Sequence, residues 1–404
     1  MPAIRGRNEM KQGWRWFGPN DPVSFDDIRQ AGASDVVSSL HHLPIGAAWT
    51  RKDVAAYKAN IENTPPGRTP LVWSVIESIP IPDDVKRLGG KATASIAAWI
   101  ASMEAAAAEG VKTICYNFMP VVDWTRTNLD HVMPTGATAL RFDNDRFAAF
   151  EMFILKRPGA EKDFSPEVQA RAKKAYDSFT QADIDYLVMV IASALPGSTT
   201  EPMTIEGFRE KLKSYAHIDA SVLRRHLIEF LQAVAPVAEQ LGVKLTLHPD
   251  DPPRPLFGLP RVASKESDYQ ALFDAVPSPA NGICFCTGSL GVRAENDLPG
   301  MARRFASRIN FVHLRATKRE ADGMSFHESD HLDGDVDMVA VLRELLAEDR
   351  RRTPQDTIIF RPDHGHRMLN DIHATRVTPG YTAIGRLKGL AELRGIIRAL
   401  DAGA

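Results

Sequence analysis

Short apolar segments alternate with helical segments along most of this chain, and that alternation restricts the fold more than any other feature. Eight segments have the length and composition of buried strands. They are Gly13–Phe17, Asp35–Leu40, Leu71–Ile76, Thr113–Phe118, Lys244–His248, Gly282–Cys286, Asn310–Leu314 and Thr357–Arg361. Because helical patterns separate most of them, we expect parallel strands. Eight parallel strands with intervening helices favour a closed (β/α)8 barrel, the TIM barrel of the α/β class.

The segments between these strands show the spacing of amphipathic helices. In Val222–Leu241, apolar residues recur about every 3.6 positions, as on the buried face of a helix. Four more segments have a helical pattern: Asp53–Glu62, Ala92–Glu109, Val336–Glu348 and Ala383–Leu400. We therefore expect helices around the barrel.

One connection is far too long for a strand-to-helix loop, which usually has about 2–6 residues. Residues 121–218 separate the fourth and fifth expected strands. Arg146–Leu155 has a helical pattern, Ser165 is a candidate N-cap, and Thr180 with Asp183 resembles a capping box. We expect a single barrel domain over residues 1–404, with 121–218 as a helical insertion over the active-site face. An independent insertion domain is the alternative.

Composition and charge exclude several other classes of protein. The 404 residues are 44% hydrophobic and 25% charged with a net charge of −2, so nothing indicates a nucleic-acid or membrane partner. Three cysteines do not suggest a secreted disulfide scaffold. No apolar run is long enough to span a membrane, and the first residues lack the apolar part of a signal peptide. We expect a cytoplasmic enzyme.

Four potential metal ligands close four consecutive expected strands: His248, Cys286, His313 and Asp363. Active sites of parallel barrels are built at these strand ends. Two imidazoles, a thiolate and a carboxylate form a donor set for a divalent metal. A single strand-end histidine is more often structural, but four such residues in succession predict a metalloenzyme. Cys284 shares a face with Cys286 and is expected one layer deeper, in the core.

Two polar residues follow these ligands closely. His364, next to Asp363, is available for proton transfer near neutral pH. Arg315 alternates with His313 and should point to the same end of the barrel, where it would bind a carboxylate; a surface salt bridge is the alternative. Glycine-rich nucleotide-binding motifs and the nucleophile elbow are absent from the sequence, which disfavours nucleotide and serine-hydrolase chemistry.

Three more residues are candidate substrate contacts, each with a structural alternative. Trp16, after the first strand, would wall a sugar pocket or plug the barrel. Glu77, at the end of the third strand, would hold a substrate hydroxyl or be a solvated strand end. His331 lies in a segment crowded with ionisable groups, Phe326–Asp337, which would serve the site or form a solvated loop.

The chain resembles the mannonate dehydratase family of hexuronate degradation, on motifs that cover nearly its full length, insertion included. The matching segments are Trp14–Val23, Val36–Pro44, Trp73–Pro80, Tyr116–Asn128, Leu155–Ala160, His248–Pro260, Cys286–Ser289, Val312–Arg315, Leu332–Met338, Arg361–His366 and Pro379–Leu390.

The resemblance implies a xylose-isomerase-like TIM barrel that converts D-mannonate to 2-keto-3-deoxy-D-gluconate and water in glucuronate catabolism, with Mn²⁺ or Fe²⁺. It implies His248, Cys286, His313 and Asp363 as metal ligands. His364 corresponds to an acid/base histidine and Tyr381 to a tyrosine thought to act in the site. Four protein ligands plus an open position for substrate also fit Mn²⁺ or Fe²⁺ better than a closed tetrahedral Zn²⁺ site. We expect a homo-oligomer, most simply a dimer.

Two departures from the family pattern affect these expectations. Ala47 stands where the pattern has an acidic residue, and members tend to begin near Met10, so residues 1–9 extend beyond it. Three alternatives stay open: a dehydratase of another sugar acid, an aldose–ketose isomerase on the same barrel, and a non-catalytic sugar-acid binding protein. Isomerase sites typically use several carboxylates and often two metals, unlike this ligand set.

Overall fold

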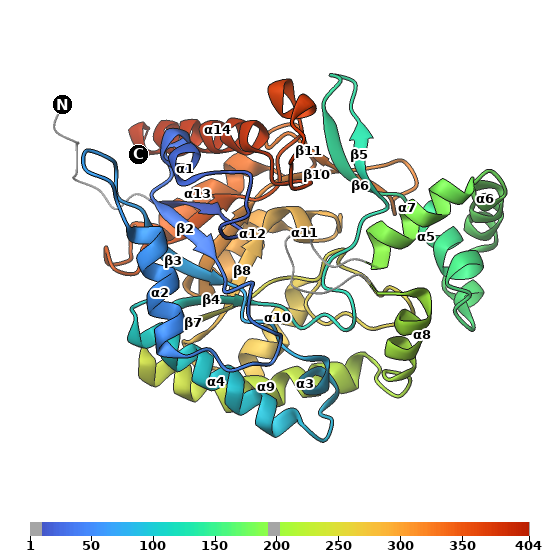
Figure 1. Cartoon of the computed structure of the whole chain (residues 1–404), viewed down its shortest axis with the longest axis horizontal. Coiled ribbons are helices and arrows are strands. Elements are labelled where there is room, and N and C mark those ends of the chain that lie inside the picture. The colour runs from blue at the N-terminus through green and yellow to red at the C-terminus, as the bar shows by residue number, and fades with distance from the viewer. Residues whose placement is uncertain (1–9, 193–202, 404) are drawn as a thin grey trace.

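The computed structural model describes residues 10–192 and 203–403, and its centre is a closed barrel of parallel strands (Figure 1). Their order around the barrel is β1 (Lys11–Arg15), β12 (Ile359–Pro362), β9 (Ile309–Leu314), β8 (Asn281–Cys286), β7 (Lys244–Leu247), β4 (Thr113–Tyr116), β3 (Val72–Glu77) and β2 (Asp35–Ser38). Each strand overlaps one of the eight expected segments. The predicted (β/α)8 barrel is therefore confirmed, while the extension before Met10 lies outside the described residues.

Helices cover the outside of the barrel (Figure 1). They are α1 (Phe25–Ala31), α2 (Arg51–Glu62), α3 (Asp83–Arg87), α4 (Ala92–Ala108), α9 (Ala220–Leu241), α10 (Glu266–Ala275), α12 (Leu298–Arg304), α13 (Met338–Asp349) and α14 (Ala383–Ala402). The short, buried α11 (Thr287–Gly291) instead follows β8 directly at the carboxyl end of the barrel. Local chemistry sets their ends. Thr50 and Asp53 form a capping box at α2, and α9 ends at Gly242, whose φ of 66° favours glycine. In the described ranges, no helix has the length and apolar character needed to cross a membrane.

Alternate residues of each strand point into the barrel and fill it in layers. One buried apolar layer consists of Val37, Val75, Cys115, Cys284, Phe311 and Ile359, each from a different strand. Two positions further along, the same strands present their next inward residues at the carboxyl end of the barrel. Glu77, Cys286 and His313 thereby come to lie next to this apolar layer, and the expected core position of Cys284 is confirmed.

The long connection between β4 and α9 is not helical throughout. Its first regular elements form a hairpin of β5 (Asn128–Val132) and β6 (Thr138–Phe142), after an irregular segment of residues 117–127. This hairpin pairs with β11 (Phe326–Ser329), which pairs with β10 (Ala316–Arg319), in an antiparallel sheet of order β10-β11-β6-β5. The helical prediction missed the hairpin because its partner strand comes late in the chain, so no local pattern indicates the pairing.

Helical segments follow the hairpin: α5 (Asn144–Ala149), a π-helical turn (Phe150–Ile154), a 3-10 turn (Ala160–Asp163), α6 (Pro166–Asp177), α7 (Gln181–Ala192) and α8 (Ile205–Lys213). The expected caps are present, since Ser165 caps α6 and Asp183 N–H donates to Thr180 Oγ1 at 3.2 Å. Figure 1 shows α5 and α6 at the edge of the molecule, on the side opposite α2. The part of the connection that reaches the strand ends is mainly the segment before the hairpin, with Asp123 and Trp124.

Asp349, at the end of α13, is a buried carboxylate whose titration should affect stability. Its Oδ1 accepts a hydrogen bond from Ile358 N–H at 2.7 Å, and burial raises its pKa to about 6 from an ordinary 3.8. Because the folded state holds this proton more tightly than the unfolded state, the free energy of unfolding should fall as pH rises from about 4 to about 6 and then level off.

Asp349→Asn keeps an acceptor for Ile358 N–H but cannot ionise. Its melting temperature should therefore fall less than that of the wild type between about pH 4 and pH 7. Differential scanning fluorimetry across this range measures the difference. Asp333→Asn, at an exposed position, is the matched control and should keep the wild-type profile. If Asp349→Asn also follows the wild-type profile, Asp349 does not titrate in this range.

Candidate metal centre and adjoining cavities

The four expected metal ligands converge at the carboxyl end of the barrel. Atoms of Cys286, His313 and Asp363 that could bind a metal all lie within 4.8 Å of one another. His248 Nε2 is 3.2 Å from His313 Nδ1, and Cys286 Sγ is 3.8 Å from Asp363 Oδ2. The side chains of this set come from the ends of β7, β8, β9 and β12, as the sequence predicted. Cys284 Sγ also lies within 4.8 Å of both imidazoles, from the layer below.

A hydrogen bond orients one imidazole toward the centre of this group, and an ion-pair contact orients the other. His248 Nδ1 lies 2.7 Å from the Pro249 carbonyl oxygen, so Nδ1–H donates to that carbonyl and leaves Nε2 free for a metal. His313 Nε2 lies 3.4 Å from Glu77 Oε2, and its Nδ1 faces the other ligands. Arg361 holds Glu77 with two donors, at 2.7 and 3.0 Å. Glu77 therefore orients a ligand histidine, and its expected contact with a substrate hydroxyl would compete with these partners.

The protonation of the cluster fits a site for a cation. Burial alone would raise the pKa of the Cys286 thiol, but Arg315 and hydrogen bonds from His248 and His313 lower it well below its usual range. For His248, burial alone would lower the pKa, but the neighbouring Cys286 thiolate raises it to about 10. In the metal-free protein, protons on the histidines thus balance the negative sulfur and carboxylate groups. A divalent cation would replace those protons, which is the usual coupling of metal binding to proton release.

His364 lies beside this cluster, in the turn after β12. It is buried, and its Nδ1 is 3.0 Å from Glu328 Oε1. Burial would raise the pKa of Glu328, but Arg315 and His364 lower it to about 2, so its carboxylate is ionised and accepts the proton in the tautomer that carries it on Nδ1. Arg315 Nη1 also lies 3.0 Å from Nδ1 and would donate to it in the other tautomer. Tyr381 packs edge-on against the His364 ring at 5.0 Å between ring centroids. Both residues line the cavity that the metal ligands line, so the structure brings the two expected catalytic residues together.

Buried ion pairs surround Arg315, the expected carboxylate-binding residue. Its guanidinium contacts Glu328 and Asp251 and lies 2.8 Å from Asp363. Arg126 reaches the same two acids, at 2.7 Å from Asp251 and 2.9 Å from Glu328. Arg315 lines the cavity, but its donors already have protein partners. A substrate carboxylate would have to displace one of them, and we assign Arg315 chiefly to holding Asp363, Glu328 and the Cys286 thiolate in their ionised forms.

Two other expected substrate contacts are not brought to the cavity. Trp16 packs in the core between the barrel and its helices, with ring centroids 4.5 Å from Phe25 and 5.8 Å from Tyr57. His331 is buried against α14, where its ring leaves no room for a side chain at Gly389. Neither residue lines either of the cavities described below, and Trp16 does not plug the barrel either, because it packs outside the strands against the helices.

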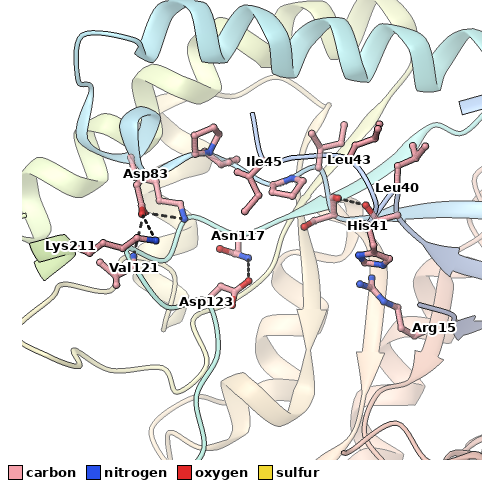
Figure 2. Close-up of a pocket in the computed structure, with 17 residues that line it drawn as sticks. Arg15, Leu40, His41, Leu43, Ile45, Asp83, Asn117, Val121, Asp123 and Lys211 are labelled. Carbon is pink, nitrogen blue, oxygen red and sulfur yellow. Dashed lines mark hydrogen bonds and ion pairs between the residues drawn. The ribbon is translucent and has the colours of Figure 1, made fainter. Parts of the chain in front are cut away.

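Two cavities adjoin at the strand ends. The inner one, of about 70 Å³, is lined by the metal ligands His248, His313 and Asp363 together with His364 and Tyr381. The outer one, of about 330 Å³, is shown in Figure 2. Four residues line both spaces: Arg15, Ser78, Asn117 and Asp123. Ala47 lines neither; it lies on a separate small pocket, so the missing acid at this position leaves both cavities intact.

Comparisons with known proteins show which family this chain is similar to. The family model described as D-mannonate dehydratase (UxuA) matches residues 10–404. A mannonate dehydratase of Brucella canis (strain ATCC 23365 / NCTC 10854 / RM-666) is 64% identical over 393 residues, 97% of this chain and 98% of the relative. A mannonate dehydratase of Marinomonas sp. (strain MWYL1) is 51% identical over 390 residues, 96% of this chain and 98% of the relative.

Solved structures give the same relationship. The crystal structure of mannonate dehydratase from Streptococcus suis serotype 2 superposes with a TM-score of 0.75 at 29% identity, covering 98% of this chain and 96% of that one. A xylose isomerase-like TIM barrel protein from Mycobacterium smegmatis matches with a TM-score of 0.50 at 13% identity and 97% coverage of both chains. The second likeness concerns the fold alone, and it agrees with the expected xylose-isomerase type of barrel.

Proposed function

Because the chain belongs to the D-mannonate dehydratase family, we propose that it removes water from D-mannonate to give 2-keto-3-deoxy-D-gluconate. We place this carbon–oxygen hydro-lyase in glucuronate catabolism and assign it Mn²⁺ or Fe²⁺. The observation that carries the proposal is the convergence of four potential ligands beside His364 and Tyr381: His248, His313 and Asp363 line the inner cavity with these two residues, and the Cys286 sulfur lies within 4.8 Å of the ligand atoms of His313 and Asp363. A four-ligand site with both thiolate and carboxylate, beside a histidine held by a carboxylate, suits metal-assisted proton abstraction next to an acid group.

The chemistry requires a base for the C2 proton and an acid for the departing C3 hydroxyl. A divalent metal held by the four ligands would supply Lewis-acid stabilisation of charge on the substrate carboxylate. In the tautomer whose Nδ1–H donates to Glu328, Nε2 of His364 has a free lone pair and takes up the C2 proton. Burial raises the pKa of Tyr381 above its usual value, so the phenol keeps its proton and can give it to the leaving hydroxyl. These two features favour His364 as base and Tyr381 as acid; the enol product then tautomerises to the 2-keto acid.

A direct assay tests this proposal. Chelated protein is incubated with D-mannonate alone and after addition of Mn²⁺ or Fe²⁺, and 2-keto-3-deoxy acid is measured by a colour reaction. We expect product only after metal addition. Other sugar acids serve as parallel substrates, and an aldose is included because an isomerase would convert it without loss of water. If the folded protein binds Mn²⁺ yet forms no product from D-mannonate, the assigned substrate is wrong.

Zinc should bind this site without supporting full turnover. Thiolate and imidazole donors give Zn²⁺ a higher affinity than Mn²⁺ or Fe²⁺, but Zn²⁺ favours a closed tetrahedral shell, which four protein ligands would complete. We therefore expect Zn²⁺ to displace Mn²⁺ and lower the rate of product formation. Competition titration with an activity readout measures both effects. Turnover with Zn²⁺ equal to that with Mn²⁺ would contradict the expectation.

A further inference from the structure

The inner cavity is too small for a whole sugar acid. Its volume of about 70 Å³ gives room for only a few water molecules, whereas D-mannonate is a six-carbon acid with a hydroxyl on every carbon beyond the carboxylate. An acid with its reacting carbons beside His364 must therefore extend elsewhere. The outer cavity, of about 330 Å³, shares Arg15, Ser78, Asn117 and Asp123 with the inner one and is the adjoining space large enough for the remaining carbons.

The outer cavity contains buried polar atoms that have no partner among the described residues. They are Oδ1 of Asp123, Nε2 of His41 and Nε of Arg15. Buried polar groups are nearly always hydrogen-bonded, so such atoms beside a cavity indicate that a ligand or water pairs with them. The other carboxylate oxygen of Asp123 accepts a hydrogen bond from Asn117 Nδ2 at 3.5 Å. This hydrogen bond fixes the orientation of the carboxylate and therefore of its free oxygen. Burial lowers the pKa of His41 to about 3, so its imidazole is neutral and can either donate or accept.

The other acid of this cavity already has partners. Asp83 accepts a hydrogen bond from Tyr215 Oη at 2.7 Å, and the Nζ atoms of Lys86 and Lys211 lie 3.8 and 3.9 Å from it. Figure 2 shows Asp83 and Lys211 at one end of the cavity, with Asn117 and Asp123 in the middle and His41 at the other end. Asp123 is thus the carboxylate of the cavity with an oxygen free for a ligand, and it lies where the two cavities meet.

We propose that the outer cavity is the subsite for the hydroxyl groups beyond C3 of the sugar acid. Asp123, positioned by Asn117, accepts a hydrogen bond from one of these hydroxyls, and His41 pairs with another. The orientation of the substrate rests on the proposed function, which places the reacting carbons in the inner cavity. The subsite makes the protein selective for chain length, because a shorter acid reaches the metal ligands but leaves Asp123 and His41 unpaired.

Binding measurements separate this subsite from the chemistry. Isothermal titration calorimetry on Mn²⁺-loaded protein, in a His364→Asn background that suppresses turnover, compares D-mannonate with the four-carbon acid of the same C2 and C3 configuration. We expect Asp123→Ala to weaken D-mannonate binding about tenfold or more, as for loss of a hydrogen bond to a charged group. Binding of the four-carbon acid should not change beyond experimental error. Asp123→Asn, which keeps the shape of the side chain, should show the same selectivity with a smaller loss.

The outcomes discriminate between explanations. Asp177→Ala, on the exposed end of α6, is the matched control and should change neither affinity. If Asp123→Ala weakens the binding of both acids equally, Asp123 acts at the metal centre. If it weakens the binding of neither acid, Asp123 has no role in substrate binding. Each of these results overturns the subsite proposal. Failure of the proposed function appears differently, as absence of 2-keto-3-deoxy product from wild-type protein while binding still depends on chain length. Absence of binding for both acids overturns the two proposals together.

Discussion

Replacing Cys286 by alanine should remove most of the affinity of the protein for Mn²⁺ and, with it, product formation. The Cys286 thiol is fully buried, its pKa is lowered well below the usual range by Arg315 and the two histidines despite burial, and Ser289 N–H donates to its sulfur. Removing a residue that hydrogen-bonds to a metal ligand typically lowers metal affinity about 10–100-fold. Loss of the ligand itself should therefore lower Mn²⁺ affinity by at least the upper end of that range.

Cys284→Ala is the matched control for this experiment. The two thiols lie on the same face of β8, two residues apart, and both are buried. Cys284 belongs to the apolar layer inside the barrel, but its sulfur is also within 4.8 Å of His248 and His313. Titration of Mn²⁺ monitored by electron paramagnetic resonance should show weak binding in Cys286→Ala and near-normal binding in Cys284→Ala. The reverse pattern would make Cys284 the ligand and would require a different set from the one predicted.

The barrel could be predicted because its strands are buried on both faces. Such strands are short continuous apolar runs, and the helices between them have the 3.6-residue repeat, so both elements are visible locally. The antiparallel sheet of β5, β6, β10 and β11 could not be predicted in the same way. Phe142 pairs with Phe326, and this pairing depends on tertiary contacts that no local pattern of β6 indicates.

The positions of the metal-ligand candidates could be predicted from the alternation of side chains along each strand, and the same rule of alternation identifies further inward residues. On β1, Gly13 and Arg15 point inward, so Trp14 and Trp16 point outward to the helices. The rule thus disfavours Trp16 as a cavity residue and selects Arg15 instead. It likewise selects Asn117, two positions after the inward Cys115 of β4.

Other features of the site depend on side-chain contacts that alternation does not give. Nothing in the sequence indicates that Arg361 binds Glu77 with two donors, or that Arg126 from the long connection joins Asp251 and Glu328. Glu328 is an informative case, since it lies in the ionisable segment singled out for His331. The segment was relevant, but the residue that reaches His364 is Glu328 of β11, whose carboxylate oxygen lies 3.0 Å from His364 Nδ1, whereas His331 packs against α14.

His364→Asn should lower kcat for D-mannonate by about 10²–10⁴-fold, the range typical of a lost general base. The asparagine amide can still donate to Glu328, so the ion pairs around Arg315 should persist. His364 is absent from the clusters of potential metal ligands, and Mn²⁺ affinity should therefore stay near that of the wild type. Steady-state kinetics, Mn²⁺ titration and a melting curve on the same preparation give the three quantities needed.

Tyr381→Phe gives the companion measurement that separates base from acid. The phenylalanine ring can keep the packing against Phe17 and His364, whose centroids lie 4.8 and 5.0 Å from that of Tyr381, but it has no proton to give. If Tyr381 is the acid and His364 the base, His364→Asn should also abolish exchange of the C2 proton with solvent deuterium. Tyr381→Phe should still allow that exchange, because proton removal does not need the phenol. Full turnover in His364→Asn would contradict the assignment and move the base to another residue. Loss of deuterium exchange at C2 only in Tyr381→Phe would make Tyr381 the base and His364 the acid.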